Sequence, residues 1–79
     1  MMKTFIIEAG WIIVGKEVSR NDSTVELTNA SVVRKWSNGR GIGGIAKAEY
    51  KDEYTLDAIG DVEIAKSKIL FEIPCEWEE

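Results

Sequence analysis

The residues best suited to chemistry in this chain lie in the segment 29–44, which reads NASVVRKWSNGRGIGG. Its basic residues Arg34, Lys35 and Arg40 surround Trp36, and four of the six residues at its end are glycines. Cationic side chains, an aromatic ring and unhindered backbone amides together bind an anion that carries a flat ring. The segment therefore predicts a site for an anionic, nucleotide-like ligand. The predicted ligand-binding residues are Arg34, Lys35, Trp36, Arg40, Gly41, Gly43 and Gly44.

The glycines also have a purely structural explanation, since they permit a tight turn between a strand and a helix. The spacing of Gly39, Gly41 and Gly44, with Asp61 further along, formally fits a dinucleotide-binding fingerprint. A chain of 79 residues is too short for the βαβ context which that fingerprint requires. Whether the segment binds an anion or only forms a turn stays open at this point.

The aromatic and basic residues have alternatives as well. Trp36 is as well suited to filling a core or an interface as to stacking on a base. Arg34 and Arg40 are equally able to pair with acidic residues of the second half of the chain, where such pairs on a surface contribute only about 0 to 1 kcal/mol. The sequence also leaves open whether the pocket lies within one subunit or between two.

The charge is distributed unevenly along the chain. Residues 1–48 carry seven basic and four acidic side chains, a balance of +3, whereas residues 49–79 carry three basic and ten acidic ones, a balance of −7. The overall charge of −4 repels a long polyanion, while a local positive pocket still attracts a small anion at short range. This pattern disfavours duplex DNA and favours a small ligand.

Composition argues against catalysis and against a metal or another cofactor. The chain has no histidine and a single cysteine, Cys75, which excludes the common kinds of nucleophilic catalysis and any internal disulfide. Acidic residues between Glu49 and Asp61 are most simply explained as a solvated loop. No apolar run approaches the roughly 20 residues that span a bilayer, and the first residues lack the features of a signal peptide. We therefore expect a non-enzymatic, cytoplasmic protein without a membrane partner.

The elements that must position the predicted site are mostly strands. Alternation predicts a strand over residues 3–8, a curved strand over 11–20 interrupted by Gly15, and a hairpin return from residue 24 that kinks at residues 29–30. Residues 42–50 show the period of a short helix, with Asn38 as its N-cap. Residues 51–61 are expected to form an irregular connection. A final hairpin is predicted from strands over 62–64 and 68–73, with Ile69, Phe71 and Ile73 facing the core.

This pattern predicts a single domain over residues 1–79, a mainly β fold with one short inserted helix. The first 36 residues resemble an Sm-like module: a strand, a glycine turn, a bent strand that carries Gly15, a hairpin and a further strand. The resemblance implies a small Sm-like or SH3-like barrel of about five strands, ring formation and RNA binding. Surplus apolar residues such as Trp11, Ile13 and Trp77 independently predict a homo-oligomer.

A second resemblance rests on four short motifs. They are N-A-x-x-x-R-x-W over 29–36, G-I-G-x-I-A over 41–46, T-L-D-x-x-G-x-V over 55–62 and I-P-C over 73–75. In these motifs the chain resembles a family of small uncharacterised proteins of phages and prophages. The resemblance implies a phage accessory protein in the host cytoplasm. Together with the basic segment it predicts an anti-defence protein that sequesters a nucleotide-derived molecule, such as a cyclic nucleotide immune signal; the alternative is an Sm-like RNA-binding or host-protein interaction module.

Overall fold

The computed structural model describes residues 2–35 and 39–77 and, of Lys35, the backbone only. Within these residues the chain is mainly β, and the prediction of about five strands with a short inserted helix is confirmed. The elements are β1 (Met2–Ile7), η1 (Glu8–Gly10), β2 (Trp11–Arg20), β3 (Thr24–Lys35), α1 (Gly41–Ile45), η2 (Ala48–Glu53), β4 (Thr55–Ala65), η3 (Lys66–Lys68) and β5 (Ile69–Pro74), where η marks a 3-10 turn. No helix of this described part is both long and apolar enough to cross a membrane.

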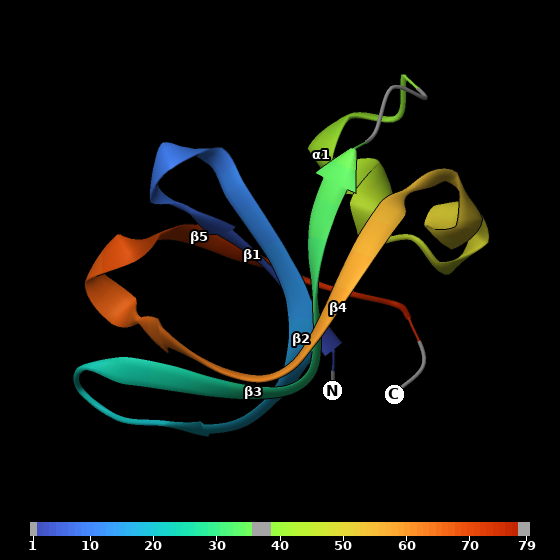
Figure 1. Ribbon diagram of the computed structural model, residues 1–79. Coiled ribbons are helices and arrows are strands. Elements are labelled where there is room, and N and C mark those ends of the chain that lie inside the picture. Colours follow the sequence, from blue (N-terminus) through green and yellow to red (C-terminus); the bar gives the residue numbers. More distant parts are fainter. Residues whose placement is uncertain (1, 36–38, 78–79) are drawn as a thin grey trace.

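The five strands form one antiparallel sheet in the order β4-β3-β2-β1-β5. Figure 1 shows that the sheet curls strongly, so that it has an inner and an outer face. The barrel predicted from the sequence is not closed, because β4 and β5 are the two edges of the sheet. The predicted final hairpin is also wrong. The turn after β4 leads β5 across to β1, where Ile7 lies opposite Ile69 and Ile6 lies opposite Phe71.

The first two connections follow the turn chemistry of the sequence. Ala9 and Gly10 both have a left-handed backbone, with φ of 71° and 84°, and reverse the chain between β1 and β2. At the next turn the side-chain oxygen of Asn21 accepts hydrogen bonds from the backbone amides of Ser23 and Thr24 at 2.7 and 2.8 Å. An asparagine that bonds to the backbone ahead of it is a common hairpin initiator. These contacts fix β3 beside β2.

The predicted bends of β2 and β3 are confirmed, and they meet each other. The β2–β3 register shifts around Gly15, and Asn29 of β3 has a φ of 52°. A Cβ atom on Gly15 would lie 3.1 Å from the Cβ of Ala30 and 3.2 Å from the Cβ of Leu27. Gly15 is therefore required because β3 passes so close, and its φ is not left-handed. The two bent strands give the sheet its curl.

The predicted irregular connection over residues 51–61 is wrong in its second half, since β4 begins at Thr55. Most β4 residues before Val62 are exposed on both sides of the strand, so the apolar alternation that identifies a half-buried strand is missing. A positive φ of 74° at Gly60 further interrupts the pattern. Pairing with β3 holds this segment extended, and that pairing is not visible in the local sequence.

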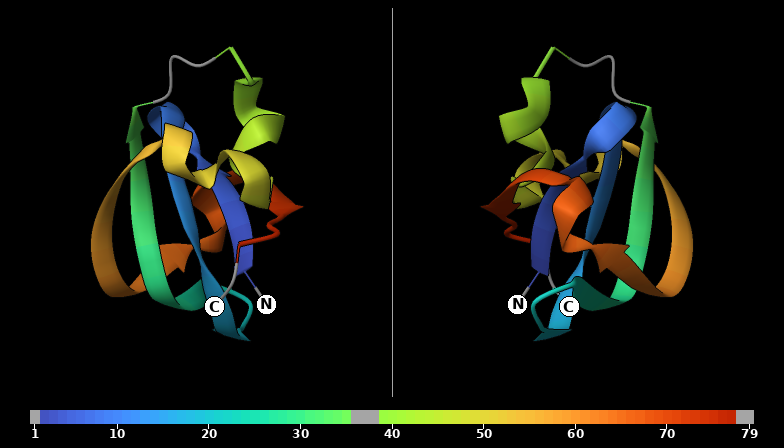
Figure 2. Two further views of the ribbon diagram at one scale, coloured as in Figure 1. Left: turned by 90° about the vertical axis from the view of Figure 1, so that its right-hand side faces the viewer. Right: turned by 90° about the vertical axis from the view of Figure 1, so that its left-hand side faces the viewer.

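The helix predicted over residues 42–50 is shorter than expected. Helix α1 ends at Ile45, and a turn leads to η2. The residue before α1 is Arg40, whose side chain makes no capping hydrogen bond, and the predicted N-cap Asn38 lies outside the described residues. Three glycines within five residues are poor helix formers, which explains the short length. Figure 2 shows α1 and η2 together on one side of the sheet.

Two clusters of buried side chains form on the two faces of the sheet. We call the first the inner core, which consists of Phe5, Ile13, Val25, Leu27, Ala30 and Ile64. We call the second the outer core, which consists of Met2, Ile6, Ile12, Val14, Val33, Ile45, Tyr54, Cys75 and Trp77. The chain end after β5 covers the outer core, where the Cys75 amide donates to the Met2 carbonyl and the Glu76 amide donates to the Ala46 carbonyl.

Strand β5 contributes less to the core than the sequence predicts. Ile69 and Ile73 are half-buried, but Phe71 keeps 47% of its surface exposed, so its predicted inward position is wrong. A register shift between Ile6 and Ile7 changes the alternation of β5. Phe71 consequently lies beside Ile6 at the edge of the outer face.

Candidate functional site

The structure separates the basic residues that the sequence places in one segment. Arg34 lies near the end of β3 and is exposed, whereas Arg40 immediately precedes α1 on the far side of residues 36–38. Trp36 lies outside the described residues, and so does the side chain of Lys35. The described part of the predicted site therefore reduces to two arginines and three glycines, whose surroundings differ.

The side chain of Arg40 packs against two residues of η2. Its guanidinium lies over the ring of Tyr50, 4.1 Å from the ring centroid, and its Nε donates to the Glu53 carboxylate at 3.2 Å. The Glu53 carboxylate raises the pKa of Arg40. A guanidinium between an aromatic face and a carboxylate already has the partners that an anionic ligand would replace. Arg40 thus follows the structural alternative given above.

The three glycines of the predicted site also divide. Gly44 is buried, and a Cβ atom there would overlap Arg40 and approach the Tyr54 hydroxyl at 2.8 Å. Gly41 has a left-handed φ of 71°, while Gly43 is exposed, and a Cβ atom added at either position would have no neighbour within 4 Å. Gly44 therefore allows α1 to pack closely against Arg40 and Tyr54, and Gly41 supplies the turn into α1.

Arg34 belongs to a different constellation, which we call the open end of the inner face. Here a hollow of about 420 Å³ is lined by Ala9, Gly10, Trp11, Val32, Val33 and Arg34. Trp11 keeps 58% of its surface exposed, although it lies opposite Ile7 and two residues from the inner-core residue Ile13. The Arg34 guanidinium pairs with Asp57 at 3.5 Å, and both of these side chains are mostly exposed. The hollow therefore combines the exposed indole ring of Trp11 with the guanidinium of Arg34, which makes an exposed ion pair.

Sequence reasoning missed Trp11 as a site residue, because a tryptophan at the start of a strand usually packs. One sequence signal was available. Trp11 directly follows the turn residues Ala9 and Gly10, and a strand begins there with few neighbours to cover its first inward side chain. The proximity of Arg34 to Trp11 depends on the β2–β3 register, in which Ile13 lies opposite Val32.

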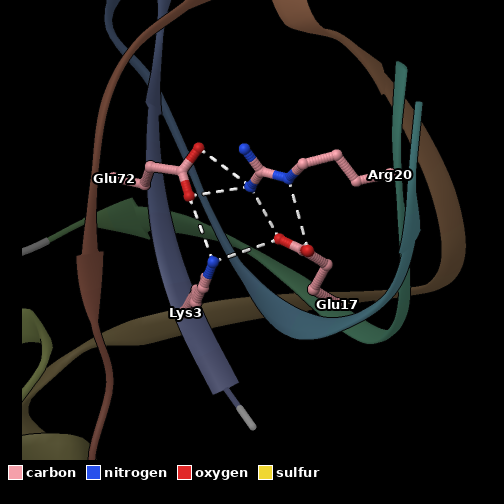
Figure 3. Close-up of polar contacts among 4 residues, drawn as sticks. All are labelled: Lys3, Glu17, Arg20 and Glu72. Carbon is pink, nitrogen blue, oxygen red and sulfur yellow. Dashed lines mark hydrogen bonds and ion pairs between the residues drawn. The ribbon is translucent and has the colours of Figure 1, made fainter. Parts of the chain in front are cut away.

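The opposite end of the inner face, which we call the closed end, is occupied by charged side chains that contact each other. Figure 3 shows Lys3 and Glu72 from the two paired strands β1 and β5, and Glu17 and Arg20 from β2. Lys3 Nζ lies 3.2 Å from Glu17 and 3.3 Å from Glu72. Arg20 Nη2 lies 2.7 Å from Glu17 and 2.8 Å from Glu72. Each cation contacts both carboxylates.

The network has an electrostatic consequence for its members. Hydrogen bonds from Arg20 and Lys3 lower the pKa of Glu17. Burial by itself raises the pKa of Glu72, but hydrogen bonds from the same two cations outweigh burial and lower that pKa. In return, Glu17 and Glu72 raise the pKa of Arg20. Glu17, Arg20 and Glu72 are therefore charged at neutral pH, and the ion pairs of the network compensate their charges.

The remaining candidate chemistry lies elsewhere. Burial raises the pKa of the Cys75 thiol, so this group is protonated at neutral pH and packs as a core residue. Over residues 2–34 and 39–77, no three acidic or cysteine side chains lie close enough together to hold a metal ion.

Comparison of the chain with protein-family models, curated proteins and solved structures finds no match.

Proposed function

We propose that this chain is a non-catalytic binding protein that sequesters an anionic, nucleotide-derived small molecule in the hollow at the open end. The observation that carries the proposal is the joint exposure of Trp11 and Arg34 on that one hollow. Its volume of about 420 Å³ falls within the range of about 300 to 1,000 Å³ that is usual for small-molecule sites. A base would stack on the indole while a phosphate oxygen binds the guanidinium.

The energetics of the two groups support this assignment. Stacking of a base on an aromatic side chain contributes about 1 to 3 kcal/mol, and an exposed indole is available for it without a change in the core. The pair between Arg34 and Asp57 is exposed and long, so it contributes only about 0 to 1 kcal/mol. A phosphate can replace Asp57 at little cost, whereas at Arg40 it would have to displace Glu53 and leave Tyr50.

The biological setting remains part of the proposal. The motif resemblance to small phage and prophage proteins favours an accessory protein that acts in the host cytoplasm, and the size of the hollow and the exposed guanidinium of Arg34 favour a small anionic ligand. A cyclic nucleotide immune signal has the required combination of base and phosphate. We also propose that the protein is a homo-oligomer. The predicted ligand-binding residue Trp36 and the side chain of Lys35 lie outside the described residues.

A binding titration against linear and cyclic nucleotides tests this function. We expect Trp11→Ala to weaken binding by about 1 to 3 kcal/mol through loss of stacking, and Arg34→Ala to weaken it by a comparable amount through loss of a charge-assisted hydrogen bond. Arg40→Ala is the matched control, because it removes the same charge a few residues away and should leave affinity unchanged. A wild-type protein that binds no member of the panel would end the proposal, and an equal loss in all three variants would move the site.

A second candidate is an interaction module for a host protein. It is favoured by a hollow of about 540 Å³ between β2, β3 and β4, lined by Val18, Glu26, Leu27, Thr28, Asp61, Val62 and Glu63. Glu26 and Glu63 lie directly opposite each other, which is unfavourable unless a cation approaches them. This acidic surface suits a basic protein segment better than RNA. Titration with a short single-stranded RNA at about 50 and 200 mM salt distinguishes an RNA partner from a protein partner, because the affinity for RNA falls steeply as the salt concentration rises.

A further inference from the structure

The hollow at the open end carries little net charge. Of the three apolar residues that the sequence suggested as surplus surface, Ile13 and Trp77 are buried, and Trp11 is the exposed one. Among the described residues that line the hollow, Arg34 is the only charged one. Its partner Asp57, at 3.5 Å, brings the charge of the pair to zero. A ligand that stacks on the indole therefore meets a cation whose charge is already compensated.

Strand pairing keeps Asp57 close to Arg34 after a ligand has bound. Asp57 lies opposite Val32 in the β3–β4 pair, and Val32 and Arg34 both line the hollow. A ligand phosphate can replace the carboxylate on the guanidinium, as proposed above. An aspartate side chain is short, however, and the paired backbones hold it in place. The displaced carboxylate therefore remains near the bound phosphate.

A phosphate group brings either one or two negative charges to this pair. A phosphodiester carries one, whereas a terminal phosphomonoester carries about 1.5 to 2 at neutral pH. An isolated arginine would attract the dianion more strongly, because the Coulomb energy increases with charge. Beside Asp57, the second charge is repelled by the carboxylate while it is attracted by the guanidinium. It gains little from the pair, and removing two charges from water costs more than removing one.

We propose that Asp57 makes the open end selective for a phosphodiester over a terminal phosphomonoester. This inference rests on the proposed function and names the class of ligand that the same site takes. The overall charge of −4 acts in the same direction. Glu8, which precedes the lining residue Ala9, is paired with Lys68 at 2.9 Å, so it adds no uncompensated charge.

A phosphodiester can come from a small cyclic nucleotide or from an RNA strand. Each further phosphate of an RNA adds a charge that an acidic chain repels, so the site should prefer the small molecule. A 3′,5′-cyclic mononucleotide and a single-stranded trinucleotide of the same base distinguish the two sources. Tighter binding of the trinucleotide would overturn the assignment to a small molecule.

The selectivity is measured with two ligands of nearly the same shape. Adenosine 5′-monophosphate and its O-methyl ester differ by one charge at about pH 7.5, and the guanosine pair repeats the comparison with a second base. We expect calorimetric titration to show about fivefold tighter binding of the methyl ester, since one more like charge close by has an effect of that order near water. Equal or tighter binding of the monophosphate would overturn the proposal.

Substitution of the carboxylate tests whether Asp57 is the cause. Asp57→Asn should reduce the preference to less than about twofold, because the monophosphate gains more affinity than the methyl ester. Asp61→Asn is the matched control: it removes the same charge from β4, but Asp61 accepts a hydrogen bond from Thr28 at 2.7 Å and does not line the open-end hollow. A preference that persists in Asp57→Asn, or that is lost in both variants, would overturn the role of Asp57.

The charge of the ligand can also be changed without any change in the protein sequence. Lowering the pH from about 7.5 to 5.5 protonates the monophosphate, whose second pKa is about 6, and leaves the methyl ester a monoanion. The affinity for the monophosphate should therefore rise relative to that for the ester, which controls for titration of protein groups. An isolated arginine predicts the opposite change, and a ratio that falls or stays constant would overturn the proposal.

The same titrations keep this inference distinct from the proposed function. Binding of both nucleotides without a preference would overturn the selectivity and leave the nucleotide site at the open end. Failure of the wild type to bind any of the nucleotides would end the proposed function and this inference together.

Discussion

At the closed end of the inner face, four charged side chains contact one another, and at the open end a tryptophan and an arginine remain exposed. Lys3, Glu17, Arg20 and Glu72 have each of their charges matched within 3.3 Å. Arg34 has one exposed partner at 3.5 Å. The ends share one apolar core between them, so the difference lies in the polar groups that finish the strands.

The comparison shows how a very small sheet can combine stability at one end with the proposed binding surface at the other. Mutual neutralisation at the closed end joins the end of β2 to β1 and β5, which helps to hold the curl of the sheet. Because this end maintains the curl, the open end does not have to be filled. An exposed indole and a replaceable ion pair can then remain available to a ligand.

Among substitutions at the two ends and at the bend between them, we expect the largest effect at the bend. Gly15→Val should destabilise the protein by about 1 to 3 kcal/mol, because the new side chain would press on Ala30 and Leu27. Urea denaturation measures this change. Gly43→Ala is the control, since that site is open and alanine suits a helix better than glycine by about 0.5 to 1 kcal/mol. An unchanged midpoint for Gly15→Val would show that the two strands can separate without loosening either end.

Arg20→Ala should remove about 1 kcal/mol, because it leaves Glu17 and Glu72 with Lys3 as their shared cation. The two carboxyl groups have lowered pKa values in the folded protein. Their contribution is therefore present above the unfolded value of about 4.3 and is lost as the pH falls through the folded pKa values. Urea denaturation at pH 7 and pH 3 should show a smaller acid loss in the variant than in the wild type.

A control for this prediction is the exposed pair between Lys68 and Glu8, which lies outside the network at 2.9 Å. Lys68→Ala should change stability by less than about 0.5 kcal/mol. Equal effects of Lys68→Ala and Arg20→Ala would mean that the closed end is no more than a set of ordinary surface pairs.

Trp11→Ala at the open end should lower stability by only about 0.5 to 1 kcal/mol, because more than half of the side chain is already in contact with solvent. Trp77→Ala is the matched truncation in the outer core, where we expect about 3 to 5 kcal/mol. Thermal or urea denaturation of both variants gives the ratio. Similar losses in the two variants would assign Trp11 to the core and remove the aromatic plate from the open end.

Asp57→Asn should have the smallest effect on folding, within about 0.5 kcal/mol, and should tighten nucleotide binding several-fold. The substitution removes the carboxylate that competes with a ligand phosphate for Arg34. Glu53→Gln is the control, because it loosens Arg40 by the same chemistry away from the hollow. A nucleotide titration that shows tighter binding with Glu53→Gln alone would return the site to Arg40.

The sequence predicted those parts of the fold that depend on neighbouring residues. Strands β1 to β3 follow from alternation, from the Asn21 turn and from Gly15 at the bend. The first part of β4, residues 55–61, was missed because an exposed edge strand needs no apolar alternation, whereas residues 62–64 were predicted as a strand. The partner of β5 could not be predicted, since a local turn signal predicts a hairpin with β4, whereas the contact of Ile69 with Ile7 joins opposite ends of the chain.

For the candidate site, the sequence identified Arg34 but not its surroundings. Neighbours in the chain suggested that Arg34 and Arg40 act together, yet Tyr50 and Glu53 bind Arg40 from a later segment. The hollow instead joins Arg34 to Trp11, two residues that are 23 positions apart and meet through the β2–β3 register. The sequence shows which side chains are present, but strand pairing decides which of them lie close together in space.

The position of β1 between β2 and β5 has a consequence for synthesis on the ribosome. Strand β1 emerges first and pairs early with β2 through a short turn, but its second neighbour is the last strand to be made. Until β5 emerges, one edge of β1 is unpaired, and Lys3 lacks Glu72. The nascent chain therefore passes through a stage in which one edge of the hydrophobic strand β1 is unpaired. Holdase chaperones that bind exposed strands can bind the chain at this stage.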